Sequence, residues 1–201
     1  MFEARRSETV RKIYERVPHS GEPNYTDLSL SGGATSPESV EKILKYLTPR
    51  QHNFYDLGSG RGEVIIQAGF SNKKIKAVGI EIMKERHDDA LKALKLARSE
   101  EFKMPGNVDL KFINDSFLNV DFSDADVVYV SALAFDDNTM KELQSRFMNL
   151  KDNAVIIVVD KELDIRRFEL QGEDNYKMGY GKGHAYIYKK REDTGAEFIN
   201  R

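Results

Sequence analysis

The stretch that decides the fold of this 201-residue chain is Asp56-Leu57-Gly58-Ser59-Gly60-Arg61-Gly62-Glu63. It follows a short apolar run at residues 53–57, which is typical of a β-strand. Glycine at every second position lets the backbone turn sharply and lets a ligand come close to it. Residues 63–68 then have a helical pattern, and Gly69 is suited to the end of a helix. We therefore expect a strand, a ligand-binding turn and a helix in direct succession.

Beyond this stretch, strand and helix patterns alternate along the chain. Further strands are expected at residues 75–80, 108–113, 126–130 and 154–159, helices at residues 84–102 and 137–148, and final strands at residues 166–170 and 184–188. Alternation of this kind forms a parallel sheet, whereas the last two strands have no helix between them and should pair antiparallel around a turn at residues 179–183. We predict an α/β, Rossmann-like fold: a mostly parallel, twisted sheet of about seven strands with helices on both faces and an antiparallel C-terminal edge hairpin.

The N-terminal part has its own pattern. Apolar residues recur at helical spacing over residues 2–17, which predicts an amphipathic helix that Pro18 ends. Residues 18–36 are rich in turn-forming residues and predict a loop, after which Ser36-Pro37 is a favourable helix start. We therefore expect an N-terminal helix and loop (1–36), a main domain (37–190) and a flexible tail (191–201).

The composition excludes several classes of function. The chain has no cysteine, which excludes disulfides and cysteine nucleophiles, and its four histidines lack the spacing of metal ligands, so no metal site is predicted. Its formal net charge is −2, which gives no direct evidence for nucleic-acid binding. No apolar run is long enough to span a membrane, and no signal peptide is evident. We expect a cytoplasmic or nuclear protein with no membrane partner, and the oligomeric state stays open.

The glycine stretch indicates a particular kind of ligand. Its spacing is G-x-G-x-G rather than the G-x-G-x-x-G of dinucleotide-binding proteins, so a bound diphosphate is not specifically indicated. Asp56 stands just before the first glycine, where a carboxylate would repel a diphosphate and attract a cation. These two features favour a positively charged ligand.

Two further acidic residues end neighbouring strands. Glu81 ends the second strand about 20 residues after Gly60, the place from which an acidic side chain accepts hydrogen bonds from both ribose hydroxyls. Asp115 follows the third strand and is placed to meet an adenine ring, with Phe117 nearby for stacking. A nucleoside ligand that carries cationic groups and no phosphate satisfies all of these positions. We therefore predict S-adenosyl-L-methionine as the cofactor.

Five stretches of sequence carry a family resemblance. Residues 56–63, 78–81 and 114–118 resemble class I methyltransferases, and residues 127–135 and 143–151 resemble more narrowly the DOT (disruptor of telomeric silencing) family of non-SET histone lysine methyltransferases. The resemblance covers roughly residues 25–190. It implies that the main domain is a methyltransferase domain and that the partner is a protein substrate with an acceptor lysine, histones being candidates. The cofactor-binding residues it implies are Thr35, Asp56, Gly58, Ser59, Gly60, Gly62, Glu63, Glu81, Asp115, Ser116, Phe117 and Ser131.

The chain departs from the family's pattern at the acceptor side. Ser131 and Ala132 stand where the family has paired asparagines, Ala34 replaces a loop glutamate, and the basic nucleosome-binding tail is largely missing. An RNA or small-molecule acceptor therefore stays open, as does a catalytically silent protein that keeps the fold and binds a partner.

A lysine acceptor needs an environment that removes its charge. Its reference pKa is roughly 10.4, and desolvation in an apolar channel lowers that pKa. Phe135, Tyr186 and Tyr25 are candidates for the channel's wall, and Ser131 is placed with them in the catalytic set. Aromatic faces also tolerate a methylated ammonium. Methylation of base or amide nitrogens typically uses a proline-containing turn after the fourth strand, and residues 131–135 contain no proline.

Overall fold

One seven-stranded sheet forms the centre of the molecule. The computed structural model describes residues 2–18, 34–50, 52–71 and 73–190, with the strands in the order β3-β2-β1-β4-β5-β7-β6. Their bounds are β1 (Asn53–Leu57), β2 (Lys76–Glu81), β3 (Asp109–Asn114), β4 (Val127–Ser131), β5 (Val155–Val159), β6 (Phe168–Met178) and β7 (Gly181–Lys190). Strands β1 to β5 are parallel, and β7 runs antiparallel to both β5 and β6. The predicted mostly parallel sheet with an antiparallel edge hairpin is confirmed.

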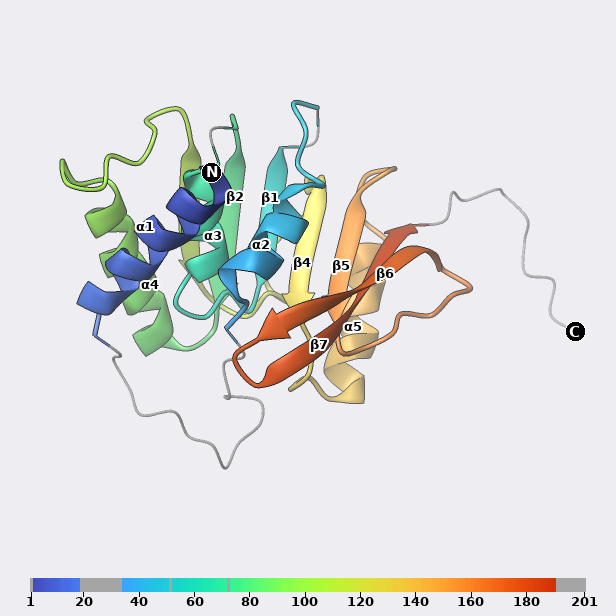
Figure 1. The fold of residues 1–201 in the computed structure, drawn as a ribbon. Helices are drawn as coiled ribbons and strands as arrows, with labels where there is room; N and C mark the ends of the chain where they lie inside the picture. The colour runs from blue at the N-terminus through green and yellow to red at the C-terminus, as the bar shows by residue number, and fades with distance from the viewer. Residues whose placement is uncertain (1, 19–33, 51, 72, 191–201) are drawn as a thin grey trace, which may run out of the picture.

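Helices cover both faces of this sheet, as predicted (Figure 1). They are α1 (Phe2–Arg16), α2 (Pro37–Leu44), α3 (Glu63–Gly69), α4 (Lys84–Ala97) and α5 (Asp137–Phe147). The apolar residues of α1 to α4 share one core with one face of the sheet, and those of α5 share a second core with the other. Strand β5 is buried along its whole length because both of its faces are covered. None of the helices in the described ranges is long and apolar enough to cross a membrane.

The N-terminal helix belongs to the first of these cores. Val10, Ile13 and Val17 are buried against the layer formed by α3 and α4. The predicted division of the chain at residue 36 stays a prediction. The expected loop falls mostly on residues 19–33 and the expected tail on residues 191–201, and both of these ranges lie outside the described residues.

Several predicted boundaries were wrong. The strand expected at residues 184–188 spans Gly181–Lys190, so the turn expected at residues 179–183 is shorter. The helix expected to reach residue 102 ends at Ala97, because the chain turns back there: the Met104 amide donates to the Ala97 carbonyl at 2.9 Å, and Lys103 adopts a left-handed φ of 50°. The strand expected at residues 166–170 continues to Met178 through an irregularity between Leu170 and Gly172. The polar residues beyond Leu170 resemble a loop, but an edge strand tolerates them because one side of it faces solvent.

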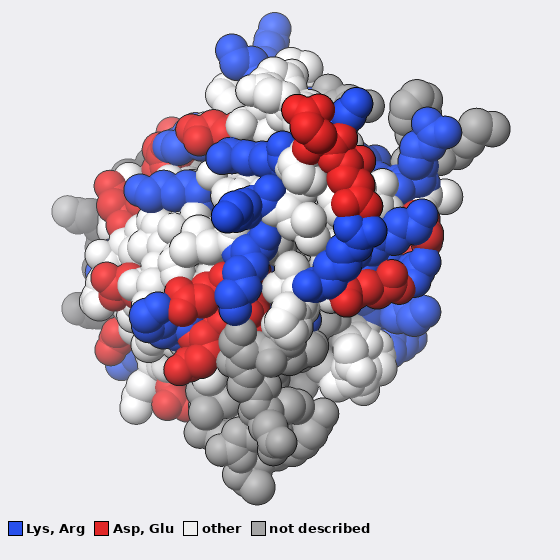
Figure 2. Space-filling model, turned by 90° about the vertical axis from the view of Figure 1, so that its left-hand side faces the viewer, with Lys and Arg blue, Asp and Glu red and all other residues white. Residues whose placement is uncertain are grey.

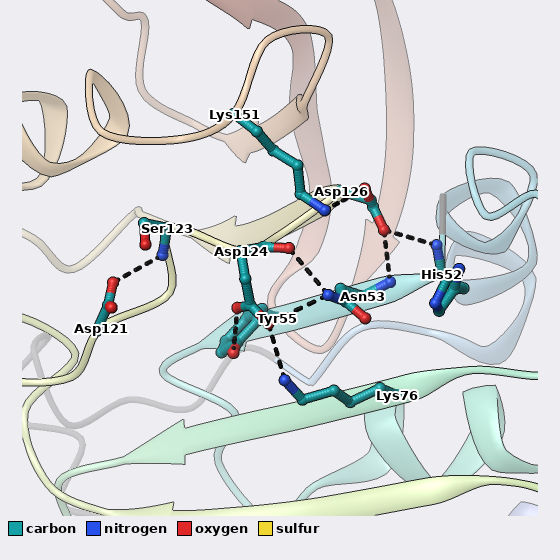
Figure 3. A network of polar contacts seen from close by, with 9 residues as sticks. All are labelled: His52, Asn53, Tyr55, Lys76, Asp121, Ser123, Asp124, Asp126 and Lys151. Carbon is teal, nitrogen blue, oxygen red and sulfur yellow. Dashed lines mark hydrogen bonds and ion pairs between the residues drawn. The ribbon is translucent and has the colours of Figure 1, made fainter. Parts of the chain in front are cut away.

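The amino ends of the central strands are closed by a polar network (Figure 3). The Asp126 carboxylate accepts the backbone N–H groups of His52 and Asn53, each at 2.9 Å, and pairs with Lys151 at 2.7 Å. Asp124 next to it accepts hydrogen bonds from the side chains of Asn53, Tyr55 and Lys76. The carboxylates of Asp124 and Asp126 therefore both have several partners within the protein, and these contacts join β1, β2 and β4. This indicates a structural role for the amino edge, so a ligand is expected at the opposite edge of the sheet.

Candidate cofactor and acceptor site

The carboxyl edge of the sheet carries most of the residues predicted to form the site. Strands β1 and β4 are neighbours although β2 and β3 come between them in sequence, so the strand order reverses at this point. Ligands of open α/β sheets bind outside the carboxyl ends of the strands at such a switch point. Leu57 pairs with Ile80, and Glu81 pairs with Asn114, so Asp56, Glu81 and Asp115 follow one another along one edge. The predicted row of acidic side chains is therefore present.

The glycine loop is shaped by its three glycines. Gly58, Gly60 and Gly62 have φ values of 81°, 55° and 85°, in the left-handed region that favours glycine. A Cβ at Gly62 would lie 2.6 Å from the Phe112 ring, so this position also lacks room for a side chain. The N–H groups of Gly58 and Ser59 both donate to the Ile80 carbonyl at 2.9 Å. The loop is therefore anchored to β2, and its curve faces the carboxyl edge.

Asp56 is a buried carboxylate in an unfavourable surrounding. Only 3% of the residue is exposed, and burial raises the pKa of its carboxyl well above the ordinary value, with Glu63 and Glu81 raising it further. No cationic side chain pairs with Asp56 among the residues that the structure describes. A cationic ligand group at this position would relieve the repulsion among the three carboxylates.

Glu81 connects the glycine loop to the start of α4. One of its carboxylate oxygens accepts the Gly60 N–H and the other accepts the Met83 N–H, both at 2.8 Å. A carboxylate oxygen has two lone pairs, so each still has one for a ligand hydroxyl. Glu63, the first residue of α3, is close enough to Asp56 to raise the pKa of that carboxyl. Burial is the main cause that raises the pKa of Glu63 itself.

The third acidic position is more open. Asp115 is exposed, and its Oδ1 accepts both the Ser116 N–H at 2.7 Å and the Asn119 side-chain amide at 2.9 Å. The Phe117 ring lies 5.2 Å from the Phe135 ring, and a Cβ on Gly58 would lie 3.7 Å from Phe135. Phe117, which follows β3, and Phe135, which follows β4, thus form an aromatic wall beside Gly58, the first glycine after β1.

Thr35 and Ser131 lie at the end of β4. The hydroxyl of Thr35 and that of buried Tyr129 are 2.7 Å apart, and Thr35 pairs with Met178 next to the β6–β7 turn. Ser131, the last residue of β4, lies close enough to Tyr180 in that turn to influence the pKa of its hydroxyl. The sequence did not single out Tyr129, because inside an apolar strand it resembles a core residue.

These residues fit S-adenosylmethionine. Asp56 lacks a cation among the described residues, and the glycine curve admits a close ligand. A buried carboxylate without a positive partner is costly unless a cationic ligand satisfies it. A nucleoside with an ammonium group supplies that partner. Ser59 Oγ is also buried without a hydrogen-bond partner in the described chain, but it lies against β2, where a Cβ on Gly79 would be 2.7 Å from it.

The predicted acceptor residues are not all brought together. Phe135 lies at the glycine loop, whereas Tyr186 stands on β7 with its ring 4.5 Å from His184 and its hydroxyl 3.4 Å from a Glu162 oxygen. Tyr25 lies outside the described residues, and within them no ring contact joins Tyr186 to Phe135. The catalytic roles of all three stay predictions.

Two contacts at the site were not anticipated. Asp160 directly follows β5, and its carboxylate accepts hydrogen bonds from the Tyr180 hydroxyl and the His184 N–H. The sequence offered no signal for this pair, because it forms only when the β6–β7 turn folds back to the carboxyl edge.

The other contact ties α1 to the glycine loop. Arg61 donates to the Val17 carbonyl at 2.6 Å, and the Tyr14 hydroxyl donates to the Arg61 carbonyl at 2.7 Å. Asp89 of α4 lies 3.3 Å from the Arg61 Nε. The loop that faces the ligand is therefore also buttressed from behind by two helices.

The family model and the most similar curated proteins point to the same family. The chain matches the family model described as "Histone methylation protein DOT1" over residues 24–181. A protein-lysine N-methyltransferase of Saccharolobus islandicus (strain REY15A) is 32% identical over 155 residues, which cover 77% of this chain and 89% of that protein. An H3 lysine-79 specific histone-lysine N-methyltransferase of Drosophila melanogaster is 29% identical over 136 residues.

The lengths of these relatives differ greatly. The match covers 62% of this chain but only 7% of the Drosophila protein, and a Caenorhabditis elegans protein of the same name is covered to 15%. Among solved structures, an RNA methyltransferase from Salinibacter ruber in complex with S-adenosyl-L-homocysteine has a TM-score of 0.58 at 21% identity, and the match covers 82% of this chain and 97% of that one. Similarity at this level concerns the fold.

Proposed function

Because the chain belongs to the DOT1 family of histone methylation proteins and is an S-adenosylmethionine-dependent methyltransferase of the class I fold, we propose that its acceptor is the side-chain amine of a protein lysine. Histones are one candidate source of that lysine. The relative from Saccharolobus supports a protein substrate, since it is named a protein-lysine N-methyltransferase and its length is nearly covered.

The observation that carries the proposal is the aromatic wall at the first glycine. Phe117 and Phe135 lie 5.2 Å apart beside Gly58, at the end of the glycine loop nearest Asp56. Apolar rings there exclude water, and exclusion of water lowers the pKa of a lysine amine toward its neutral, nucleophilic form. The same faces accept a methylated ammonium product.

In this proposal each residue of the carboxyl edge binds a different part of the cofactor. The bound cofactor would supply the methyl group, which it carries on a sulfonium. Asp56 holds its cationic amino-acid end, and Glu81 accepts hydrogen bonds from its ribose hydroxyls. Asp115 and Ser116 meet its base, and the Phe117 ring is shared between that base and the acceptor wall. Thr35, Ser59, Glu63 and Ser131 complete the pocket, and Tyr25 and Tyr186 remain candidates for the acceptor channel.

The proposal is tested by offering several acceptors at once. The protein is incubated with methyl-labelled cofactor and, separately, with histones, a protein extract, total RNA and a small-molecule extract. We expect label in protein, and mass spectrometry should place it on lysine. The Glu81→Ala variant, with weakened cofactor binding, serves as the negative control for contaminating enzymes. Label confined to RNA or small molecules would refute the proposal, and cofactor binding without transfer to any acceptor would indicate the catalytically silent alternative.

A further inference from the structure

Asp160 occupies an unusual position at the carboxyl edge. It follows β5 directly, and the last residue of that strand, Val159, pairs with Ser131 of β4. Its φ of 67° lies in the left-handed region, which aspartate and asparagine enter more readily than other residues with side chains. The backbone therefore turns sharply after β5 and leaves the carboxylate one strand away from the end of β4.

Neutral donors hold this carboxylate from two sides. The His184 N–H donates to one oxygen at 2.8 Å, and the Tyr180 hydroxyl donates to the other. Ser131 lies close enough to the same Tyr180 hydroxyl to influence its pKa. Within the part of the chain that the structure describes, Asp160 forms no ion pair. A fixed negative charge thus lies beside the end of β4 without a positive partner.

We propose that Asp160 and Tyr180 bind the cationic nitrogen of the acceptor, so that the site selects a primary ammonium. This inference rests on the proposed methylation of lysine and names the residues that recognise the amine. A partly buried carboxylate with both oxygens oriented favours an ammonium and repels a phosphate, so it discriminates against nucleic acid at the same edge. Tyr180 acts chiefly as a positioning residue, because its hydroxyl holds one oxygen of the carboxylate.

The pair binds the ammonium and does not take its proton. The reference pKa values of aspartate and lysine are about 3.9 and 10.4, so the proton stays on the amine while the two groups are paired. Methyl transfer itself needs the neutral amine, so the bound acceptor releases its proton to solvent before the nitrogen attacks the methyl group; Asp160 acts in the binding step that precedes this. A hydroxyl or an amide acceptor carries no charge for Asp160 to recognise. Asp160 therefore selects the acceptor by its charge, and the aromatic wall selects it by its shape.

Kinetics of matched variants test the inference. Asp160→Asn removes the charge, keeps the shape and tolerates the positive φ, and Tyr180→Phe removes one hydroxyl. Asp137→Asn is the control, because it removes an equal charge from a fully exposed side chain near the same edge, at the start of α5. We expect Asp160→Asn to raise KM for a lysine substrate by about 10- to 100-fold, the range for losing a hydrogen bond to a charged group, with a smaller change in kcat. Tyr180→Phe should raise KM less, and Asp137→Asn should leave it unchanged.

A binding measurement separates recognition from turnover. n-Butylammonium is titrated into the protein with S-adenosylhomocysteine present and followed by NMR, with n-butanol as its neutral counterpart. We expect saturable binding of butylammonium but not butanol, loss of this binding in Asp160→Asn and its retention in Asp137→Asn. Equal binding by the wild type and Asp160→Asn would overturn the inference, as would an equal loss in both charge variants.

The two experiments keep the two proposals apart. If the wild type transfers no label to protein lysine but binds butylammonium through Asp160, the proposed function fails while the amine site stands. If lysine is methylated and Asp160→Asn changes neither KM nor butylammonium binding, the proposed function stands and the amine site fails. Thermal denaturation of each variant shows whether Asp160→Asn is folded, and a folded variant with a lower kcat and an unchanged KM would also overturn the inference.

Discussion

At the scale of single residues, Asp56 shows how a ligand site costs stability. Burial first, and then Glu63 and Glu81, raise the pKa of its carboxyl above the ordinary value. A raised folded-state pKa means that the folded protein favours the protonated form. The stability gained by protonation is therefore fully present below the unfolded pKa and is lost as pH rises toward the folded pKa. The ligand-free protein carries the cost of the ionised, buried carboxyl at pH values above its unfolded pKa, and a cationic ligand relieves it.

Asp56→Asn should therefore change stability and affinity in opposite directions. We expect the melting temperature of the ligand-free protein to rise and the cofactor affinity to fall by roughly 1–3 kcal/mol, because a charged partner is lost. Thermal denaturation and calorimetric titration measure the two effects. Asp109→Asn, at an exposed position on β3, should change neither. An unchanged cofactor affinity in Asp56→Asn would refute the assignment of the site.

Acidification should weaken cofactor binding through the same residue. As pH falls through the raised pKa, the Asp56 carboxylate is protonated and no longer attracts the ligand's ammonium. We expect calorimetric affinity to decrease in the wild type as pH falls through this raised pKa, and the decrease should be smaller in Asp56→Asn. Parallel pH curves for the two proteins would show that another group controls the dependence.

A site residue can be predicted from the sequence when its neighbours in the sequence already place it at the site. Asp56 and Glu81 could be predicted because each ends a strand at a recognisable distance from the glycines. Asp160 could not, because an acidic residue after an apolar strand usually marks only an exit to solvent. Its partner Tyr180 comes from a turn that reaches the site only through antiparallel pairing of β7 with β5. Long-range pairing of this kind has no signature in a single sequence.

At the scale of elements, the glycine loop depends on its packing against β3 and α4. A Cβ at Gly62 would lie 2.6 Å from the Phe112 ring and 3.0 Å from Ala90, whereas nothing lies within 4 Å of a Cβ at Gly60. Gly62→Ala should therefore destabilise the protein by more than about 2 kcal/mol, from backbone strain and overpacking together. Gly60→Asn, which tolerates a positive φ, should cost less. Urea denaturation compares the two, and equal losses would contradict this account of the loop.

The polar network at the amino edge should contribute stability that depends on pH. Burial acts to raise the pKa of Asp126, but the bonds from Lys151 and from the Asn53 and His52 amides outweigh it and lower that pKa. Stability from a lowered pKa is present above the unfolded value and is lost as pH falls through the folded value. We expect Asp126→Asn to lower the free energy of unfolding by about 1–3 kcal/mol at pH 7 and to approach the wild type below pH 4.

Cofactor titration is the control for this variant, because Asp126 lies at the edge opposite the site. An unchanged affinity at pH 7 is expected. A stability difference that persisted undiminished in acid would show that the charge of Asp126 is not the cause.

The types and order of the elements could be predicted, but some of their ends could not. Apolar periodicity marks where a helix or strand is buried, and the five parallel strands follow it closely. The end of α4 is decided instead by a backbone turn at Lys103, and the length of β6 by its pairing with β7. Both depend on contacts rather than on composition.

At the scale of the whole molecule, the distribution of surface charge indicates how the protein recognises its substrate. Lysine and arginine are interspersed with aspartate and glutamate on the side that carries α1 and α4 (Figure 2), and several of them form ion pairs, such as Arg16 with Glu101. The formal net charge of the chain is −2. This side of the molecule therefore gives no broad positive field to hold a nucleic-acid backbone. Recognition is therefore expected to depend on the acceptor segment itself.

This leads to a prediction about salt. A protein that neutralises 6–10 phosphates loses about 10³- to 10⁵-fold in affinity between 50 and 200 mM salt. We expect kcat/KM for a lysine-containing protein substrate to fall by less than about tenfold over this range, since a single buried ion pair is screened far less than a surface field. Added DNA should not compete. A steep salt dependence together with competition by DNA would show that this chain recognises its substrate through a nucleic-acid backbone, and a mixed surface would then be the wrong basis for judging its partners.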